Sequence, residues 1–220
     1  MLIGTIVSMR GLIGSIILLA SCSAFAQGLD LKADQFQTIH FNDIAQTRYH
    51  FKDGTLQAEA NQSSSVLIHA FDSVRKVSEL SFEWYGEGSL GVRDAKHEAS
   101  KSGDDAWLRI GLMVHGAAPT IPFFAPAWIK QTREALKLPS NRMVYLVAGS
   151  QHEAGSQWES PYSSSIRSIA LASKDSEDKP WQKSQHHLDE ALDIVGIWLM
   201  VDSDNTKGKI KTHLRNLQLK

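Results

Sequence analysis

Two short segments contain side chains that could perform chemistry. The stretch from Gly103 to Arg109 places the adjacent carboxylates Asp104 and Asp105 shortly before an arginine. Carboxylates can exchange protons or accept hydrogen bonds from a ligand, and arginine can hold them through two parallel bonds. The segment from Trp158 to Tyr162 adds two aromatic rings of a kind that stacks on sugars. The residues expected to bind a ligand are Asp104, Asp105, Arg109, Trp158 and Tyr162.

An oxygen-rich segment lies near the C-terminus, where Asp202 to Thr206 reads Asp-Ser-Asp-Asn-Thr. Calcium takes six to eight oxygen ligands, and alternating acids in a turn can supply several of them. The spacing is not that of an EF-hand. The sequence therefore predicts either a calcium site with Asp202, Asp204 and Asn205 as ligands, or a solvated turn in which these side chains bond to the local backbone.

Two other patterns have structural explanations as well as chemical ones. His186, Glu190 and Asp193, next to His187 and Asp189, would share a helix face if this segment were helical, which permits a metal or proton-transfer site. A solvated helix explains the same residues. Gly86 to Gly91 spells G-x-G-x-x-G, but a dinucleotide site needs a helix to open at those glycines. The charged segment that follows has no apolar stripe, which indicates a glycine-rich loop between strands.

The N-terminus resembles an export signal. An apolar run follows Arg10 and ends in Leu-Ala-Ser-Cys, where Cys22 is the only cysteine of the chain. This layout predicts cleavage before Cys22 and attachment of a lipid to its sulfur. Ala24-Phe25-Ala26 offers an alternative, ordinary cleavage site. We expect a signal peptide over 1–21, or over 1–26, and the translation start could be Met1 or Met9.

Composition restricts the classes of function. The formal net charge is −1 and no strongly basic cluster is present, so nucleic acid is not an expected partner. A hydrophobic content of 42% is typical of a folded domain. We expect an N-terminal segment over 22–44 and a single domain over 45–220. The protein is expected in the periplasm or anchored to the outer membrane by its lipid, with a glycan or another envelope component as partner.

The elements that must position these residues are mostly strands. Asp53-Gly54 between two alternating segments predicts a β-hairpin over 49–58. Further strands are predicted by short apolar or alternating runs: 65–71, 80–85, 107–114, 143–148, 166–172, 194–201 and 213–219. Residues 126–136 and 185–192 are the expected short helices. The pattern predicts a mainly β protein, an antiparallel, jelly-roll-like β-sandwich with one or two short helices.

Three ordered blocks resemble an exported bacterial family catalogued as domain of unknown function 3047. They are Gly103 to Arg109, Trp158 to Tyr162 together with Arg167, and Asp202 to Thr206. The resemblance covers roughly residues 45–219, and it implies that the glycine-rich stretch lies between two strands. It implies no activity. The Pro-rich segment 118–139 is longer than the family's usual connection.

The sequence favours a non-catalytic module that binds a carbohydrate-like ligand at a face or rim of the sandwich. One alternative is an envelope glycan hydrolase that uses two carboxylates among Asp104, Asp105, Glu159 and Asp202. Asp104 or Asp105 is separately expected to pair with Arg109 or Arg167, either at a ligand site or as a structural clasp that holds loops. Another alternative is a structural lipoprotein that only contacts other envelope proteins. No enzyme motif or certain cofactor is present in the sequence, calcium being the one candidate.

Overall fold

The computed structural model describes residues 27–174 and 181–220. The predicted signal segment, both cleavage sites and Cys22 lie outside the described residues. No helix within these two ranges is long and apolar enough to cross a bilayer.

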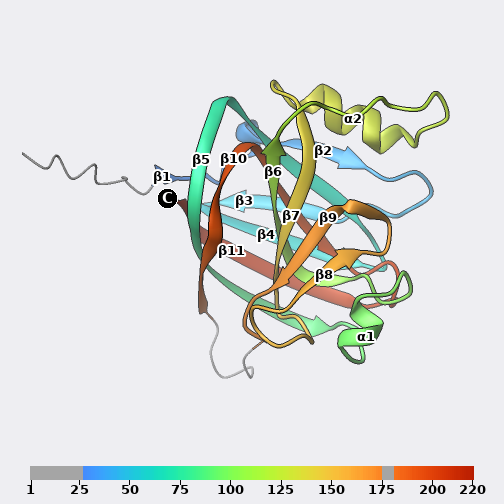
Figure 1. Ribbon diagram of the computed structural model, residues 1–220. Coiled ribbons are helices and arrows are strands. Elements are labelled where there is room, and N and C mark those ends of the chain that lie inside the picture. The colour runs from blue at the N-terminus through green and yellow to red at the C-terminus, as the bar shows by residue number, and fades with distance from the viewer. Residues whose placement is uncertain (1–26, 175–180) are drawn as a thin grey trace, which may run out of the picture.

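The described chain forms one eleven-stranded sheet that folds over into a two-layered sandwich (Figure 1). The predicted mainly β, jelly-roll-like sandwich is therefore confirmed. Every strand pair is antiparallel except that of β7 with β9, which is parallel. The strands are β1 (Gln27–Gly28), β2 (Gln37–His40), β3 (Arg48–Lys52), β4 (Thr55–Asn61), β5 (Ser65–Ser89), β6 (Ala106–His115), β7 (Ser140–Ala148), β8 (Gln157–Ser160), β9 (Ser163–Ala170), β10 (Gln182–Asp202) and β11 (Lys209–Leu219).

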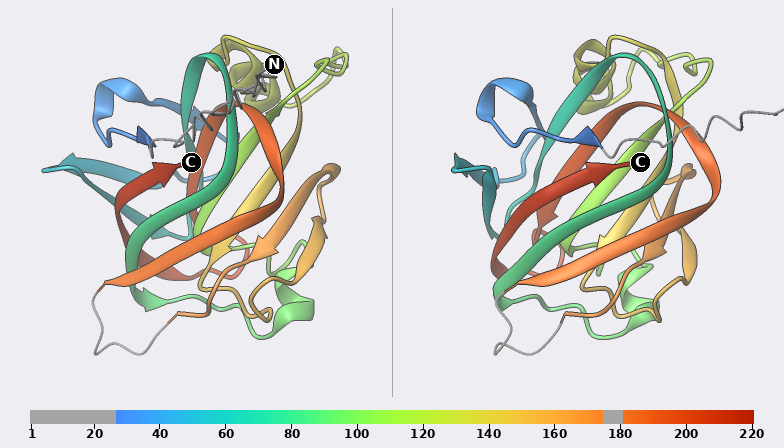
Figure 2. Two further views of the ribbon diagram at one scale, coloured as in Figure 1. Left: turned by 60° about the vertical axis from the view of Figure 1, so that its left-hand side comes forward. Right: turned by 90° about the vertical axis from the view of Figure 1, so that its left-hand side faces the viewer.

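Two long strands join the layers. β5 runs for 25 residues and β10 for 21, and the two curve side by side around the molecule (Figure 2). Their register shifts between His187 and Leu192 and again between Ile194 and Gly196, where the strands bend. Bulges of this kind increase the local twist and allow a strand to pass from one layer to the other. The segments 65–71 and 80–85, predicted as two strands, are therefore two halves of β5.

The strand pairs assign each half to a layer. The first layer has the order β3, β4, β11, the C-terminal half of β5 and the N-terminal half of β10. The second layer begins with β2 and the N-terminal half of β5, and continues through the C-terminal half of β10 to β6, β7, β9 and β8. β1 and β2 precede residue 45, yet they pair with β11 and β5.

Alternation along the strands creates two apolar clusters. In β6, Leu108, Ile110 and Leu112 point between the layers into the main core. Gly111 and Met113 alternate with them, and Met113 faces an outer cluster on the far side of the second layer. The outer cluster also contains Ile39, Val66, Tyr145, Val147, Trp198 and Met200.

The hairpin and one helix agree with the sequence. Asp53 and Gly54 have φ values of 50° and 71° and connect β3 to β4 as predicted. The helix expected over 126–136 is α2 (Ala127–Ala135), which packs against β2 and β5. A further helical turn, α1 (Ala95–Glu98), and a 3₁₀ turn (Ala33–Gln35) complete the described helices.

The helix predicted over 185–192 is wrong, because these residues belong to β10. Antiparallel pairing with β5, where His186 lies opposite Leu80 and His187 opposite Glu79, outweighs the local helical spacing. Neighbouring residues of a strand point to opposite faces. A strand also rises about 3.3 Å per residue, so His186, Glu190 and Asp193 are spread along β10 and not stacked on one helix face, and the metal or proton-transfer site predicted for them loses its geometric basis.

Candidate functional site

A buried ion triad lies where β6 begins and β10 ends. The Arg109 guanidinium binds Asp104 at 2.7 Å through one nitrogen and Asp202 at 3.3 Å through another. Side-chain exposures are 4% for Arg109, 1% for Asp202 and 15% for Asp104. Asp104 is therefore the member of the triad that reaches solvent. The predicted pairing of Arg109 with the Asp104–Asp105 block is present, and Arg109 rather than Arg167 makes it.

Burial controls the electrostatics of the triad. Removal from water raises the pKa of Asp104, and the charge of Arg109 partly opposes that rise. Burial likewise raises the pKa of Asp202 above its usual value. Burial alone would lower the pKa of Arg109, but the charges of Asp104 and Asp202 reverse this and raise it. Arg109 is thus a permanent cation that its carboxylate partners require for compensation.

Asp105 fastens the C-terminal turn to the start of β6. Its carboxylate accepts hydrogen bonds from the Asn205 amide nitrogens of backbone (3.1 Å) and side chain (3.2 Å), and from the Thr206 N–H at 2.6 Å. In the other direction, the Asp202 carboxylate of the C-terminal segment accepts a hydrogen bond from the Ala106 N–H of β6 at 3.0 Å. These contacts tie two segments together that are far apart in sequence, which is the role of a clasp.

The predicted calcium ligands are only partly arranged for a cation. Carboxylate oxygens of Asp105, Asp202 and Asp204 lie within 4.8 Å of one another. However, Asp105 and Asp202 already accept from N–H donors or Arg109, and the side-chain nitrogen of Asn205 points at Asp105. The residues present therefore do not fit a calcium site well, because Arg109 occupies the position of positive charge. The arrangement of donors argues against calcium binding by Asp202, Asp204 and Asn205, which a titration with calcium tests.

The exposed rim beside the triad is marked by Tyr162. This residue is 57% exposed, and its hydroxyl lies 3.4 Å from the Lys101 carbonyl oxygen and 3.5 Å from Asn205 Oδ1. Partial burial, and then the negative charges of Asp104 and Asp204, raise the pKa of its hydroxyl. The Lys101 ammonium is 5.5 Å from the centre of the ring. An aromatic ring, a carboxylate, a carboxamide and an ammonium group therefore meet at this rim.

Trp158 is partly buried and packs against other side chains. Its ring stacks on His152 with centroids 4.0 Å apart and planes within 7°, and it packs against the outer cluster. Its neighbour Glu159 lies opposite Arg167 of β9 and, being adjacent in the strand, points to the other face. The structure thus joins Asp104, Asp105, Arg109 and Tyr162 into one region and leaves Trp158 and Glu159 outside it.

Residues 34–218 match the model of a protein family described as "Protein of unknown function (DUF3047)". The chain belongs to the DUF3047 family. No curated protein matches the chain. Among solved structures, it is similar to a mutant of a family 29 carbohydrate binding module, described as probing the mechanism of ligand recognition by that family. That similarity has 10% sequence identity and a TM-score of 0.38, and it covers 90% of this chain and 92% of the other.

An aromatic row on the outer face of this DUF3047 domain was missed by sequence reasoning. The strand registers align Trp198, Gly111, Tyr145, Ser168 and Trp158 across β10, β6, β7, β9 and β8. Gly111 leaves no room for a side chain, since a Cβ there would lie 2.9 Å from the Trp198 Cβ. Alternation within a strand indicates which of its residues share a face. The row also depends on how neighbouring strands are aligned with one another, which the sequence of a single strand does not reveal.

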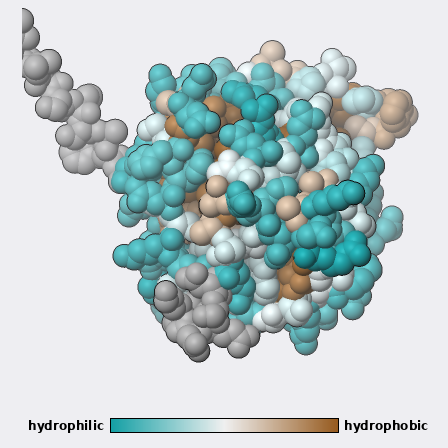
Figure 3. Space-filling model, turned by 60° about the horizontal axis from the view of Figure 1, so that its bottom comes forward, coloured by the Kyte–Doolittle hydropathy of each residue, from teal (hydrophilic) through white to brown (hydrophobic). Residues whose placement is uncertain are grey.

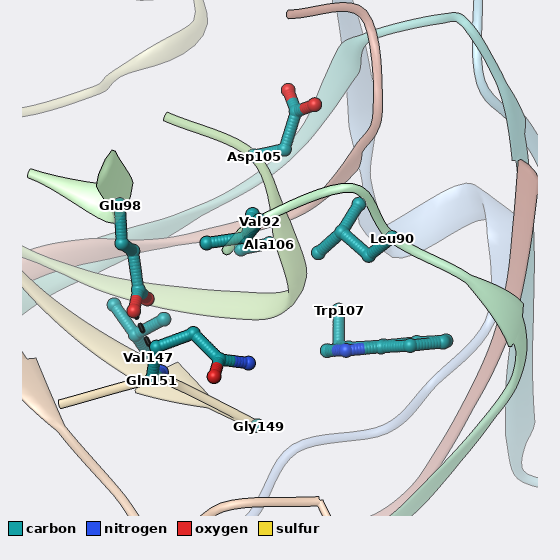
Figure 4. A pocket seen from close by; sticks show the side chains of 9 residues that line it. All are labelled: Leu90, Val92, Glu98, Asp105, Ala106, Trp107, Val147, Gly149 and Gln151. Atoms are coloured by element: carbon teal, nitrogen blue, oxygen red, sulfur yellow. Dashed lines mark hydrogen bonds between the residues drawn. The ribbon is translucent and has the colours of Figure 1, made fainter. Parts of the chain in front are cut away.

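A cavity beside the start of β6 in this DUF3047 domain is too small for an organic ligand. It measures about 20 Å³ and is lined by two carboxylates among mostly apolar groups (Figure 4). One of them, Glu98, accepts from the Ser150 hydroxyl at 2.9 Å and the Gln151 N–H at 2.7 Å. The volume suits roughly one water molecule. The lining residues are Leu90, Val92, Glu98, Asp105, Ala106, Trp107, Val147, Gly149 and Gln151.

The glycine-rich stretch beside this cavity belongs to the sheet. Gly86 and Gly88 lie within β5, and α1 begins only at Ala95. A Cβ on Gly88, whose φ is 99°, would lie 2.2 Å from the Lys209 carbonyl oxygen. Glycine is thus required there by the close approach of β11. The expected loop between strands is wrong for Gly86 and Gly88, because pairing with β11 extends β5 through Ser89.

Proposed function

We propose that this domain is a non-catalytic module that binds a carbohydrate-like ligand at the rim around Tyr162. The observation that supports it is the exposed Tyr162 ring beside Asn205 and the solvent-reaching Asp104. The apolar face of a sugar ring stacks on an aromatic side chain, while its hydroxyl groups bond to carboxylates and carboxamides. This rim offers both kinds of contact in one place.

The fixed geometry of the polar groups favours binding. Arg109 holds Asp104, and Asp105 holds Asn205, so neither side chain needs to be ordered when a ligand arrives. Ordering of side chains is a main cost of association, and a preorganised site avoids part of it. The buried triad that looked like a candidate catalytic centre therefore acts as the support of the rim.

The carboxylates are poorly arranged for hydrolysis. Asp104 and Asp202 both bind one guanidinium, and Asp105 is filled by three N–H donors. A glycosidase needs one carboxylate free to move a proton and a second that faces the sugar from the other side. Glu159, the remaining candidate, lies on a strand face away from this region. We therefore prefer binding to turnover.

The experiment is a glycan array followed by product analysis. Wild-type protein should retain a defined set of oligosaccharides and return them uncleaved. Tyr162→Ala should lose that retention at an unchanged melting temperature, because the ring is mostly exposed. Trp158→Ala should instead lower the melting temperature, because this ring stacks on His152 and packs against the outer cluster. A Tyr162→Ala protein that retains the same glycans would remove the proposed site, and cleaved oligosaccharides would favour the hydrolase.

We also propose that the protein is exported and lipidated at Cys22. The apolar run and the Leu-Ala-Ser-Cys sequence support this, and they lie outside the described residues. Cells expressing the protein should incorporate a palmitate analogue into the wild type but not into Cys22→Ala. Secretion of an unlabelled protein cut after Ala26 would show instead that the ordinary cleavage site is used, giving a soluble periplasmic form.

A further inference from the structure

A rigid apolar tip projects from the loop between β6 and α2. From Gly116 to Ile129 the sequence has no charged side chain, and at the tip Phe123 and Phe124 are 96% and 89% exposed. In Figure 1 the loop extends beyond the sandwich at the upper right, and Figure 3 shows a brown projection at the corresponding edge. Large apolar side chains exposed as a contiguous group mark an interaction surface.

The backbone presents these two rings in a defined turn. The Ala125 N–H donates to the Pro122 carbonyl at 3.0 Å, which closes a turn with the two phenylalanines at its corners. The Ile129 N–H donates to the Pro126 carbonyl at 3.1 Å and begins α2 directly afterwards. Prolines on both sides of the rings restrict the chain further. The rings are therefore held out into solvent.

Positive charge lies directly behind the tip on α2. Lys130 and Arg133 are exposed, and neither forms an ion pair with any residue in the described ranges. Lys137, one turn further, pairs with Asp72. Glu134 is the only acidic residue between Gly116 and Arg142. An apolar tip with a basic collar is the charge arrangement that suits an anionic lipid surface.

We propose that Phe123 and Phe124 insert into the interface of an anionic bilayer while Lys130 and Arg133 contact its headgroups. A stable protein partner usually covers about 800 Å² on each side, which two rings on a narrow turn do not offer. Lipid requires no such complementary surface, because aromatic rings and basic side chains partition into the interface individually. This inference does not depend on the sugar-binding proposal, since the loop and the Tyr162 rim are separate surfaces.

The experiment places a fluorescent label in the loop itself, so that membrane binding by the apolar N-terminal run is not mistaken for insertion of the loop. Full-length protein carrying Cys22→Ser and Thr120→Cys is labelled with an environment-sensitive nitrobenzoxadiazole dye. Vesicles of phosphatidylcholine with roughly one quarter phosphatidylglycerol are then added. We expect a blue shift and an increase in fluorescence, with at least a tenfold loss of apparent affinity in the F123S/F124S variant. Substitution at these exposed positions should leave the melting temperature unchanged.

Two controls locate the effect. A label at Val74→Cys, an exposed apolar position in the bend of β5, should not respond when the Thr120 label does. K130E/R133E should bind anionic vesicles no better than vesicles of phosphatidylcholine alone. The proposal is overturned if the Thr120 label does not respond to vesicles, or if F123S/F124S responds like the parent. A response that follows protein concentration without lipid would overturn it in favour of contact with a second copy.

Discussion

Replacement of Arg109 by methionine should destabilise the protein more than any single surface change. Methionine fills a similar volume but leaves Asp104 and Asp202 without their cation, and these carboxylates have only 15% and 1% of their side chains exposed. A buried charge that loses its partner must either remain uncompensated or take up a proton. Both outcomes reduce the free energy of unfolding near neutral pH.

The magnitude follows from the burial of the triad. Removal of one partner of a buried ion pair costs about 3–5 kcal/mol, a large part of the stability of an ordinary domain. For a chain of this size, about 1 kcal/mol changes the melting temperature by about 2–4 °C. The expected decrease is therefore about 6–20 °C. Arg48→Met is the matched control, because the Arg48–Glu59 pair is 73% and 27% exposed and should contribute little.

The pH dependence distinguishes this reasoning from a simple packing defect. Burial already raises the pKa values of Asp104 and Asp202, and loss of Arg109 should raise them further. An acid with a raised folded-state pKa destabilises the fold when it is ionised, and this cost disappears as pH falls through that folded pKa. In urea denaturation, the free energies of unfolding of R109M and wild type should thus differ less near about pH 4.5 than near about pH 7.5. A constant difference, or one below about 1 kcal/mol at neutral pH, would refute the ion-triad account.

Three further predictions concern other parts of the domain. Gly88→Ala should unfold at a much lower temperature than Gly28→Ala, since its Cβ would meet the Lys209 carbonyl at 2.2 Å while the space around Gly28 is open; equal melting temperatures would contradict this. Burial lowers the pKa of His69, so protonation of this side chain is disfavoured in the folded state. The fold therefore loses stability as pH falls below about 6.5, because the unfolded chain takes up the proton more readily. The melting temperature of wild type should therefore fall more than that of His69→Gln on acidification, and an equal fall in both proteins would count against this. Millimolar calcium should not change the melting temperature, because Arg109 already compensates Asp202; an increase that Asp204→Asn abolishes would restore the predicted calcium site.

Local sequence signals identified most of the strands, and they failed where distant pairing decides the structure. Asp53-Gly54 specifies its hairpin through its own backbone preference. The polar residues between Phe71 and Leu80 interrupt the apolar pattern, so a single bent β5 was read as two strands. Residues 185–192 have a helical spacing, but the neighbouring β5 provides strand partners that the local sequence does not reveal.

The candidate site was predictable to a similar degree. Asp104 or Asp105 was expected to pair with Arg109 or Arg167, and Asp104 does pair with Arg109, with Asp202 as a third member. Their burial could not be read from the sequence, because it depends on how the C-terminal turn packs over β6. Trp158 and Tyr162, close in sequence, have different environments, since one stacks on His152 and the other is exposed.

The most direct test of the proposed function is a calorimetric titration of the oligosaccharide best retained on the array into wild type, Tyr162→Ala and Val74→Ala. Val74 is also exposed, at 39%, but lies in the bend of β5. We predict saturable binding to wild type and Val74→Ala with equal affinity, at least tenfold weaker binding to Tyr162→Ala, and recovery of the oligosaccharide intact. Equal affinity for all three proteins, or no oligosaccharide bound by wild type, would contradict the account.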